Sequence, residues 1–151
     1  SNSLIECLVF GKRAIEATRI HQKQLEIPQF TTRYHCNSQH TDIYVTLKKE
    51  VSKILTTHAG IIRNAQLLQA GLEQLDSLEQ QLPNETNEYY SLLSQNLITV
   101  ARLIIRSALY RQESRGGHFR EDFPQTNPDY LYHIVQQKGE EIRTIPVKTE
   151  C

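Results

Sequence analysis

The residues of this chain that could do chemistry gather in one short segment, residues 113–124. It combines charged, polar and glycine residues in an order that the end of a helix does not require. By spacing alone the pattern favours an ordinary helix end, in which Arg111 and Arg115 face the negative end of the helix dipole and Gly116 is left-handed. The alternative is a functional segment.

A second candidate site is the start of the first predicted helix, residues 3–19. Ser3 can cap this helix, and Glu6 three residues later completes a capping-box pattern. The first backbone N–H groups of a helix are unpaired and lie at the positive end of its dipole, so they favour an anion or an electron-rich ring edge. An ordinary capping box explains the same residues, since such boxes are common at helix starts.

Other kinds of site find no support in the sequence. The formal net charge is zero, which argues against nucleic acid or an anionic membrane as a partner. No uninterrupted apolar run approaches the roughly 18 residues of a membrane helix, and no signal peptide is visible. The histidines and cysteines lack metal-site spacing, so no metal is expected. The three cysteines indicate reduced thiols in a cytoplasmic protein: Cys7, Cys36 and Cys151.

The elements that must position these residues are helices, and the fold class is predicted to be all-α. Apolar residues recur at helical spacing in three stretches of residues 41–117, which predicts an antiparallel three-helix bundle of the spectrin-repeat kind. Asn64 is expected to cap the second helix of the bundle. The third helix of the bundle should begin between Glu85 and Tyr89, and Gly116-Gly117 should end it. The predicted core is Leu47, Val51, Leu68, Leu72, Leu75, Leu97, Val100 and Ile104. Residues 20–40 are expected to be a connector, and residues 118–151 an irregular tail.

The sequences of both candidate sites resemble motifs of one known protein family. The chain opens with Ser-Asn-Ser-Leu, and after a helix rich in Ala, Leu and Ile it carries a Glu-Ser-Arg-Gly-x-His-x-Arg-x-Asp-x-Pro pattern. The pattern lies at Glu113, Ser114, Arg115, Gly116, His118, Arg120, Asp122 and Pro124. These motifs resemble the C-terminal part of the flavoproteins that include L-aspartate oxidase and the flavoprotein subunits of succinate dehydrogenase and fumarate reductase. The resemblance covers nearly the whole chain and implies a fragment of a larger enzyme.

The resemblance implies FAD as the cofactor, with the first helix belonging to the flavin-binding domain. Asn2, Ser3 and Leu4 would contact the flavin ring, whereas no catalytic residue and no Gly-x-Gly-x-x-Gly fingerprint lies in the chain, so the fragment alone should be inactive and should not retain FAD. The segment that carries Arg115, His118 and Arg120 would contact the flavin-binding and capping domains, with His118 as a possible substrate-side residue.

Within this family the resemblance favours the aspartate oxidase branch, because fewer than thirty residues follow Pro124. This branch oxidises L-aspartate to iminoaspartate, with oxygen or fumarate reoxidising the flavin, as the first step toward quinolinate and NAD. One alternative is the respiratory branch, which has a membrane-anchored iron–sulfur partner. An alternative of another class is a free-standing helical interaction module.

Overall fold

The computed structural model describes residues 3–20, 35–83 and 88–147. It divides into two compact units, Ser1–Thr32 and Arg33–Cys151. The described part of the first unit is one helix, α1 (Ser3–Ile20), in agreement with the helix predicted over residues 3–19. Four of its large apolar side chains are exposed: Leu8, Val9, Phe10 and Ile15.

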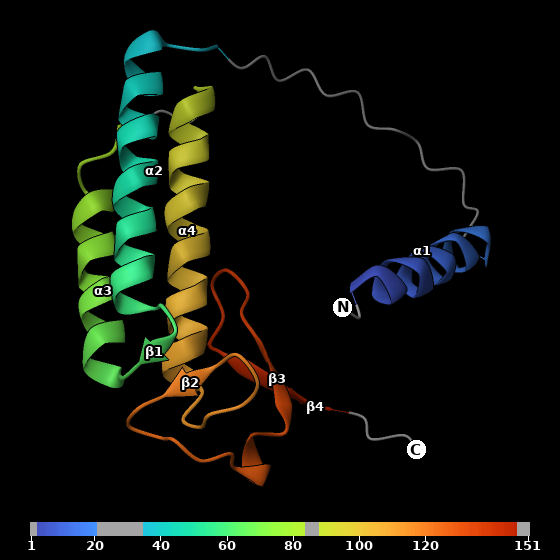
Figure 1. Ribbon diagram of the computed structural model, residues 1–151. Coiled ribbons are helices and arrows are strands. Elements are labelled where there is room, and N and C mark those ends of the chain that lie inside the picture. Colours follow the sequence, from blue (N-terminus) through green and yellow to red (C-terminus); the bar gives the residue numbers. More distant parts are fainter. Residues whose placement is uncertain (1–2, 21–34, 84–87, 148–151) are drawn as a thin grey trace. The chain divides into compact units, whose positions relative to one another are not determined.

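The second unit contains three long helices that lie side by side with alternating direction, as Figure 1 shows: α2 (Ser38–His58), α3 (Ala65–Glu79) and α4 (Tyr89–Tyr110). The prediction of an all-α bundle is confirmed. The Asn64 side chain accepts a hydrogen bond from the Leu67 amide and caps α3, as expected. α2 begins at Ser38, before the predicted residue 41, because Asn37 provides a cap of the same kind.

The hydrophobic core lies between these helices. The prediction of its residues is correct for α2 and α3 but wrong in part for α4. Leu47, Val51, Leu68 and Leu75 are buried, and Leu72 and Leu97 pack against them at the edge. Val100 and Ile104 are instead 54% and 47% exposed. The buried face of α4 is shifted by about one residue and consists of smaller side chains together with two isoleucines: Ser91, Ser94, Ile98, Ala101, Ile105 and Ala108.

Two serines lie on the buried face of α4. They interrupt its apolar pattern in the sequence, yet they can be buried because their hydroxyl groups are hydrogen-bonded. The Ser91 hydroxyl donates to the Pro83 carbonyl and the Ser94 hydroxyl to the Tyr90 carbonyl, so neither is buried without a partner. α4 therefore has two faces that carry apolar residues. The prediction chose the face with the larger side chains, whereas the smaller residues face α2 and α3.

The end of α4 also differs from the prediction. The helix stops at Tyr110, and Arg111 is already extended, so Gly116-Gly117 does not end it. Gly116 does adopt a positive φ of 58°, but in a tight turn that follows the helix. In this turn the backbone groups of Arg115 and His118 exchange two hydrogen bonds.

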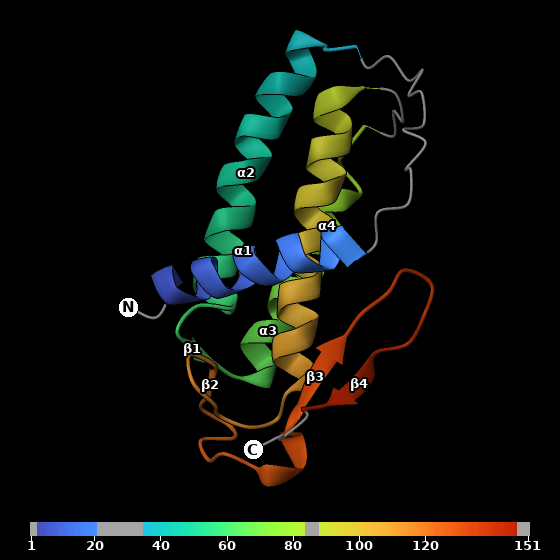
Figure 2. The same ribbon diagram turned by 90° about the vertical axis from the view of Figure 1, so that its right-hand side faces the viewer.

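Short strands organise the chain around the end of α4, where an irregular tail was expected. β1 (Ile62–Arg63) pairs in parallel with β2 (Phe119–Arg120). After a 3-10 turn at Pro128–Tyr130, β3 (Tyr132–Val135) pairs antiparallel with β4 (Arg143–Pro146). Figure 2 shows this hairpin beside the C-terminal half of α4, to which it is tied by hydrogen bonds from the Gln136 amide to the Leu103 carbonyl and the Ser107 hydroxyl.

Among the described helices, α4 alone has the length and the mean hydropathy that a membrane span would need. The core helix of a bundle meets the same criterion, and α4 occupies that place here.

Candidate functional site

A carboxylate with no exposed surface lies just beyond the C-terminus of α4. Glu113 accepts hydrogen bonds from Arg111 Nη1 at 2.7 Å, from Arg115 Nε and Nη2 at 2.8 and 3.0 Å, and from the Asn127 amide at 2.9 Å. The hydrogen bonds from Arg115, joined by those from Asn127 and Arg111, outweigh burial and lower the pKa of Glu113 to about 2. The carboxylate is therefore ionised and fully occupied within its own unit.

Arg111 joins this carboxylate to the tail. Its Nη1 also donates to the Tyr130 carbonyl at 2.8 Å, and its Nη2 donates to the Tyr132 carbonyl at 2.7 Å. The guanidinium lies 5.3 Å from the centre of the Tyr132 ring, within the range of a cation–π contact. A single arginine thus fixes the start of β3 against the end of α4.

Arg120 is buried at 1% exposure and closes the helix end. Its Nη1 donates to the carbonyls of Ala108, Leu109 and Arg111, which lie at the negative end of the α4 dipole. Its Nε and Nη2 bind both oxygens of Asp122, at 2.8 and 2.7 Å. The guanidinium therefore provides the helix cap that the sequence pattern assigned to Gly116.

Asp122 carries this connection to the next helix. Its Oδ2 also accepts a hydrogen bond of 2.9 Å from the Ala65 amide, the first residue of α3. Arg120 lowers the pKa of Asp122 to about 2 despite burial, and the Ala65 amide acts in the same direction. The Arg120–Asp122 pair thus bridges the negative end of α4 and the positive end of α3, so both helix dipoles favour it.

His118 is held at both ring nitrogens. Arg63 Nη1 lies 2.9 Å from Nδ1, and the Arg111 carbonyl lies 3.2 Å from Nε2. An arginine can only donate, so we assign Nδ1 as the acceptor and the proton to Nε2. Burial lowers the pKa of His118 below 6.5; the Arg111 carbonyl opposes this, and the charges of Arg63, Arg120 and Arg111 reinforce it. The ring is neutral at pH 7.

The structure therefore brings Arg115, His118 and Arg120, all singled out in the sequence, into one network at the end of α4. Ser3 and Leu4 begin α1 in the other unit, and Asn2 lies outside the described residues. Sequence reasoning did not single out Arg63. No motif surrounds it, and only the pairing of β1 with β2 brings it to His118.

A second buried carboxylate lies at the other end of the bundle and was also missed. Glu88 is the N-cap of α4; it accepts hydrogen bonds from the amides of Ser91 and Asn37, and His40 Nδ1 lies 3.0 Å from its Oε2. Burial raises its pKa, but these amides and His40 together bring it down to about 2. The Glu88 carboxylate joins the starts of α4 and α2.

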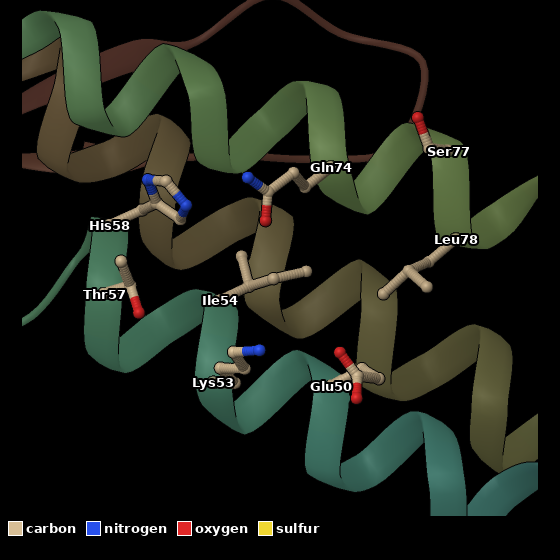
Figure 3. Close-up of a pocket in the computed structure, with 8 residues that line it drawn as sticks. All are labelled: Glu50, Lys53, Ile54, Thr57, His58, Gln74, Ser77 and Leu78. Atoms are coloured by element: carbon tan, nitrogen blue, oxygen red, sulfur yellow. The ribbon is translucent and has the colours of Figure 1, made fainter.

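A groove of about 450 Å³ runs along α4 to the network. Its lining includes Val100, Leu103 and Ile104 of α4, Ile134 of β3, and at one end Arg63 and His118. Another pocket of about 450 Å³ lies between α2 and α3, where Figure 3 shows His58 facing Gln74, and Lys53 and then Glu50 farther along α2. It contains no residue of the network. In the described ranges there is no cluster of three or more metal-ligating side chains.

Residues 48–151 match the model of the fumarate reductase flavoprotein C-terminal domain, which covers the bundle from the middle of α2 onward and the whole network at the end of α4. The chain belongs to this flavoprotein family. The network at the end of α4 therefore lies within the region that matches this flavoprotein C-terminal domain.

The flavoprotein relatives are enzymes several times longer than this chain. L-aspartate oxidase of Nostoc sp. is 33% identical over 91% of this chain, and the match spans 29% of that protein. An uncharacterised FAD-dependent oxidoreductase of Methanocaldococcus jannaschii is 36% identical, with coverage of 66% and 20%. One subunit of the fumarate reductase (CoM/CoB) of Methanothermobacter marburgensis is 29% identical, with coverage of 89% and 28%.

The fold of the chain is found in solved flavoproteins. A variant of the E. coli quinol fumarate reductase FrdA superposes over 100% of this chain and 26% of its own, with a TM-score of 0.54 and 19% identity. The Mycobacterium smegmatis Sdh1 complex in the apo form gives a TM-score of 0.55 at 20% identity. These likenesses support the fold.

Proposed function

We propose that this chain is the C-terminal part of an FAD-dependent L-aspartate oxidase that acts in the cytoplasm. The observation that carries the proposal is that proteins named L-aspartate oxidase match nearly the whole chain, the Nostoc protein at 33% identity over 91% of it and the Acinetobacter baylyi protein at 27% over 99%. The fumarate reductase subunit of Methanothermobacter matches at 29%, so a fumarate reductase subunit is the competing assignment.

The reaction is the oxidation of L-aspartate to iminoaspartate, the first step toward quinolinate and NAD. The amino acid loses a hydride from Cα and a proton from nitrogen, and oxygen or fumarate finally takes the electrons. Bound FAD would supply the electron acceptor for this step. The chain has no Gly-x-Gly-x-x-Gly fingerprint, so its residues fit only a small part of a flavin site.

That small part is the start of α1. The helix begins at Ser3 and has 18 residues, so the amides of Ser3 and Leu4 lie in its first turn, where they lack intrahelical partners. Directed at the N1–C2=O edge of the flavin, with Asn2 shaping the turn, they would stabilise negative charge on the reduced ring.

The network at the end of α4 has a supporting role in this proposal. Glu113 and Arg120 are buried and fully engaged, Arg115 binds Glu113, and both ring nitrogens of His118 have partners within the unit. We expect these residues to fix the shape of the surface that meets the flavin-binding and capping domains. His118 contacts the substrate in this scheme only if its present hydrogen bonds are exchanged.

The test is the substrate preference of the full-length protein. Oxygen uptake and fumarate reduction are measured with L-aspartate and with succinate as the electron donor, and the keto acid released by hydrolysis of iminoaspartate is quantified. Oxidation of L-aspartate alone is the expected result. Oxidation of succinate, with an iron–sulfur partner, would place the protein in the respiratory branch. A protein that binds no flavin would favour the interaction module.

A further inference from the structure

The outward face of α4 carries large apolar side chains that no other described element of the second unit covers. Val100, Leu103 and Ile104 are 54%, 39% and 47% exposed. They lie at i, i+3 and i+4, so they form one stripe on the helix, and this stripe is one wall of the groove of about 450 Å³. Single exposed apolar residues are ordinary, but a continuous stripe that lines a groove indicates an interaction surface.

The same end of the bundle has further exposed apolar residues. Ile62 of β1 and Phe119 of β2 lie opposite each other in the parallel pair, and both are exposed, as is Ile61. Arg63, the next residue of β1, lines the groove. The apolar surface therefore ends beside the positively charged side chain of Arg63.

The second, independent observation is that Arg63 has no carboxylate partner among the described residues. Its Nε donates to the Ala59 carbonyl and its Nη1 to His118, and no carboxylate of the described residues lies within 4.0 Å of its nitrogens. Arg111, Arg115 and Arg120 at this end of the bundle are each paired with Glu113 or Asp122. Because a partly buried charge is stabilised by an opposite charge, the half-buried Arg63 is suited to a carboxylate from outside the unit.

We propose that this face of α4 is a docking surface for the flavin-carrying part of the same polypeptide, through a segment with apolar side chains and an aspartate or glutamate that pairs with Arg63. The inference rests on the proposal that the chain is the C-terminal part of a longer flavoprotein. The matched region spans 29% of the Nostoc relative and 26% of FrdA, so most of such a protein is available as a partner. A second copy placed by a two-fold axis would offer the same stripe and the same arginine, and none of the residues that line the groove has a carboxylate.

The experiment compares two charge insertions in the full-length protein. Ile104→Glu places a carboxylate in the stripe, and Val45→Glu is the matched control on α2, at 45% exposure against 47% for Ile104. We expect Ile104→Glu to lower the unfolding temperature in calorimetry by about 5 °C or more, with earlier flavin release, and Val45→Glu to change it by about 1 °C at most. Circular dichroism checks that both variants keep their helices; if Ile104→Glu does not, Ile104→Ser replaces it.

The carboxylate is tested at Arg63. Arg63→Gln should lower the unfolding temperature and make it less sensitive to salt, Arg63→Lys should recover part of the loss, and Arg106→Gln on an exposed site of α4 is the control. A loss equal in Arg63→Lys and Arg63→Gln, with unchanged salt dependence, would mean that Arg63 only supports His118 and would overturn this part of the proposal.

Two results would overturn the docking surface itself. If Ile104→Glu halves the mass in light scattering and leaves flavin release and the unfolding of each protomer unchanged, a second copy covers the face. If Ile104→Glu behaves like Val45→Glu in every measurement, the face is open to solvent. Substrate preference is measured on the unaltered protein. That measurement can therefore refute the proposed activity without refuting the docking surface, and the variants can refute the docking surface without refuting the activity.

Discussion

The two ends of α4 each bury an ionised carboxylate, but they neutralise it by different means. At the N-terminus, Glu88 binds two backbone amides and His40, and the helix dipole itself favours the negative charge. At the C-terminus the dipole opposes a negative charge, and Glu113 is held by Arg111 and Arg115. A carboxylate can thus serve as a simple cap at one helix end, whereas at the other it requires cations.

This difference accounts for the complexity of the C-terminal end. Arginines that neutralise Glu113 have further donors to satisfy, and Arg111 satisfies them with the carbonyls of Tyr130 and Tyr132. Arg120 caps the helix and binds Asp122, which reaches the start of α3. Two helices and the tail are therefore fixed by one buried network, while the Glu88 end fixes two helix starts with a single side chain.

Acid should give the largest effect, because it weakens both ends together. The pKa values of Glu88 and Glu113 are lowered from 4.5 to about 2, and that of Asp122 from 3.8 to about 2. Between these values the unfolded chain binds more protons than the folded one, so the stabilisation is complete above about pH 5 and is lost as the pH falls toward 2. Urea unfolding of the 151-residue chain at several pH values measures this loss. A free energy of unfolding that is level from pH 5 to pH 3 would contradict it.

The same substitution at the two ends separates their contributions. Glu113→Gln turns an amide toward the partly exposed Arg111 and Arg115 and removes their counter-charge, so we expect a loss of about 3 kcal/mol in the free energy of unfolding, the low end for breaking a buried pair. Glu88→Gln keeps an oxygen acceptor for the Ser91 amide, so its loss should be smaller. Glu73→Gln on the exposed surface of α3 is the control. Urea unfolding at pH 7 ranks the three, and equal losses at positions 88 and 113 would refute the distinction between the ends.

The smallest effect is expected at a single cap near the network. Asn64→Ala removes the acceptor for the Leu67 amide and the donor to Glu121, and caps of this kind contribute about 1 kcal/mol. Asn96→Ala on an exposed site of α4 is the matched control and should be nearly neutral. Thermal unfolding distinguishes the two, and a loss at position 64 as large as that of Glu113→Gln would mean that the Asp122 bridge also depends on this cap.

The sequence predicts the bundle well because helical periodicity and caps are local signals. The start of α3 at Asn64 and the start of α4 near Tyr89 follow from neighbouring residues, and both are confirmed. The inner face of α4 cannot be predicted in this way. In the sequence, a serine that will be buried, such as Ser94, looks the same as an exposed one, because its hydrogen bond to the Tyr90 carbonyl is not visible there. The apolar period alone cannot choose between two faces that both contain isoleucine.

The network was predictable as a segment but not as an arrangement. The motif marks Arg115, His118 and Asp122, yet their partners lie outside it: Asn127, Arg63 and Ala65, respectively. The predicted stop at Gly116 failed for the same reason, since a side chain nine residues beyond Arg111 provides the cap. Long-range pairing of this kind has no local signature.

The most direct test of the structural role of the network is made at His118 in the full-length protein. His118→Ala removes the acceptor for Arg63 and the donor to the Arg111 carbonyl. The unfolding temperature is measured together with kcat and KM for L-aspartate, the proposed substrate, at a temperature where the variant is folded. A supporting role predicts a lower unfolding temperature with kcat and KM within about twofold of the unaltered enzyme. A KM raised tenfold or more, at an unchanged unfolding temperature, would show that His118 binds the substrate and would contradict the supporting role.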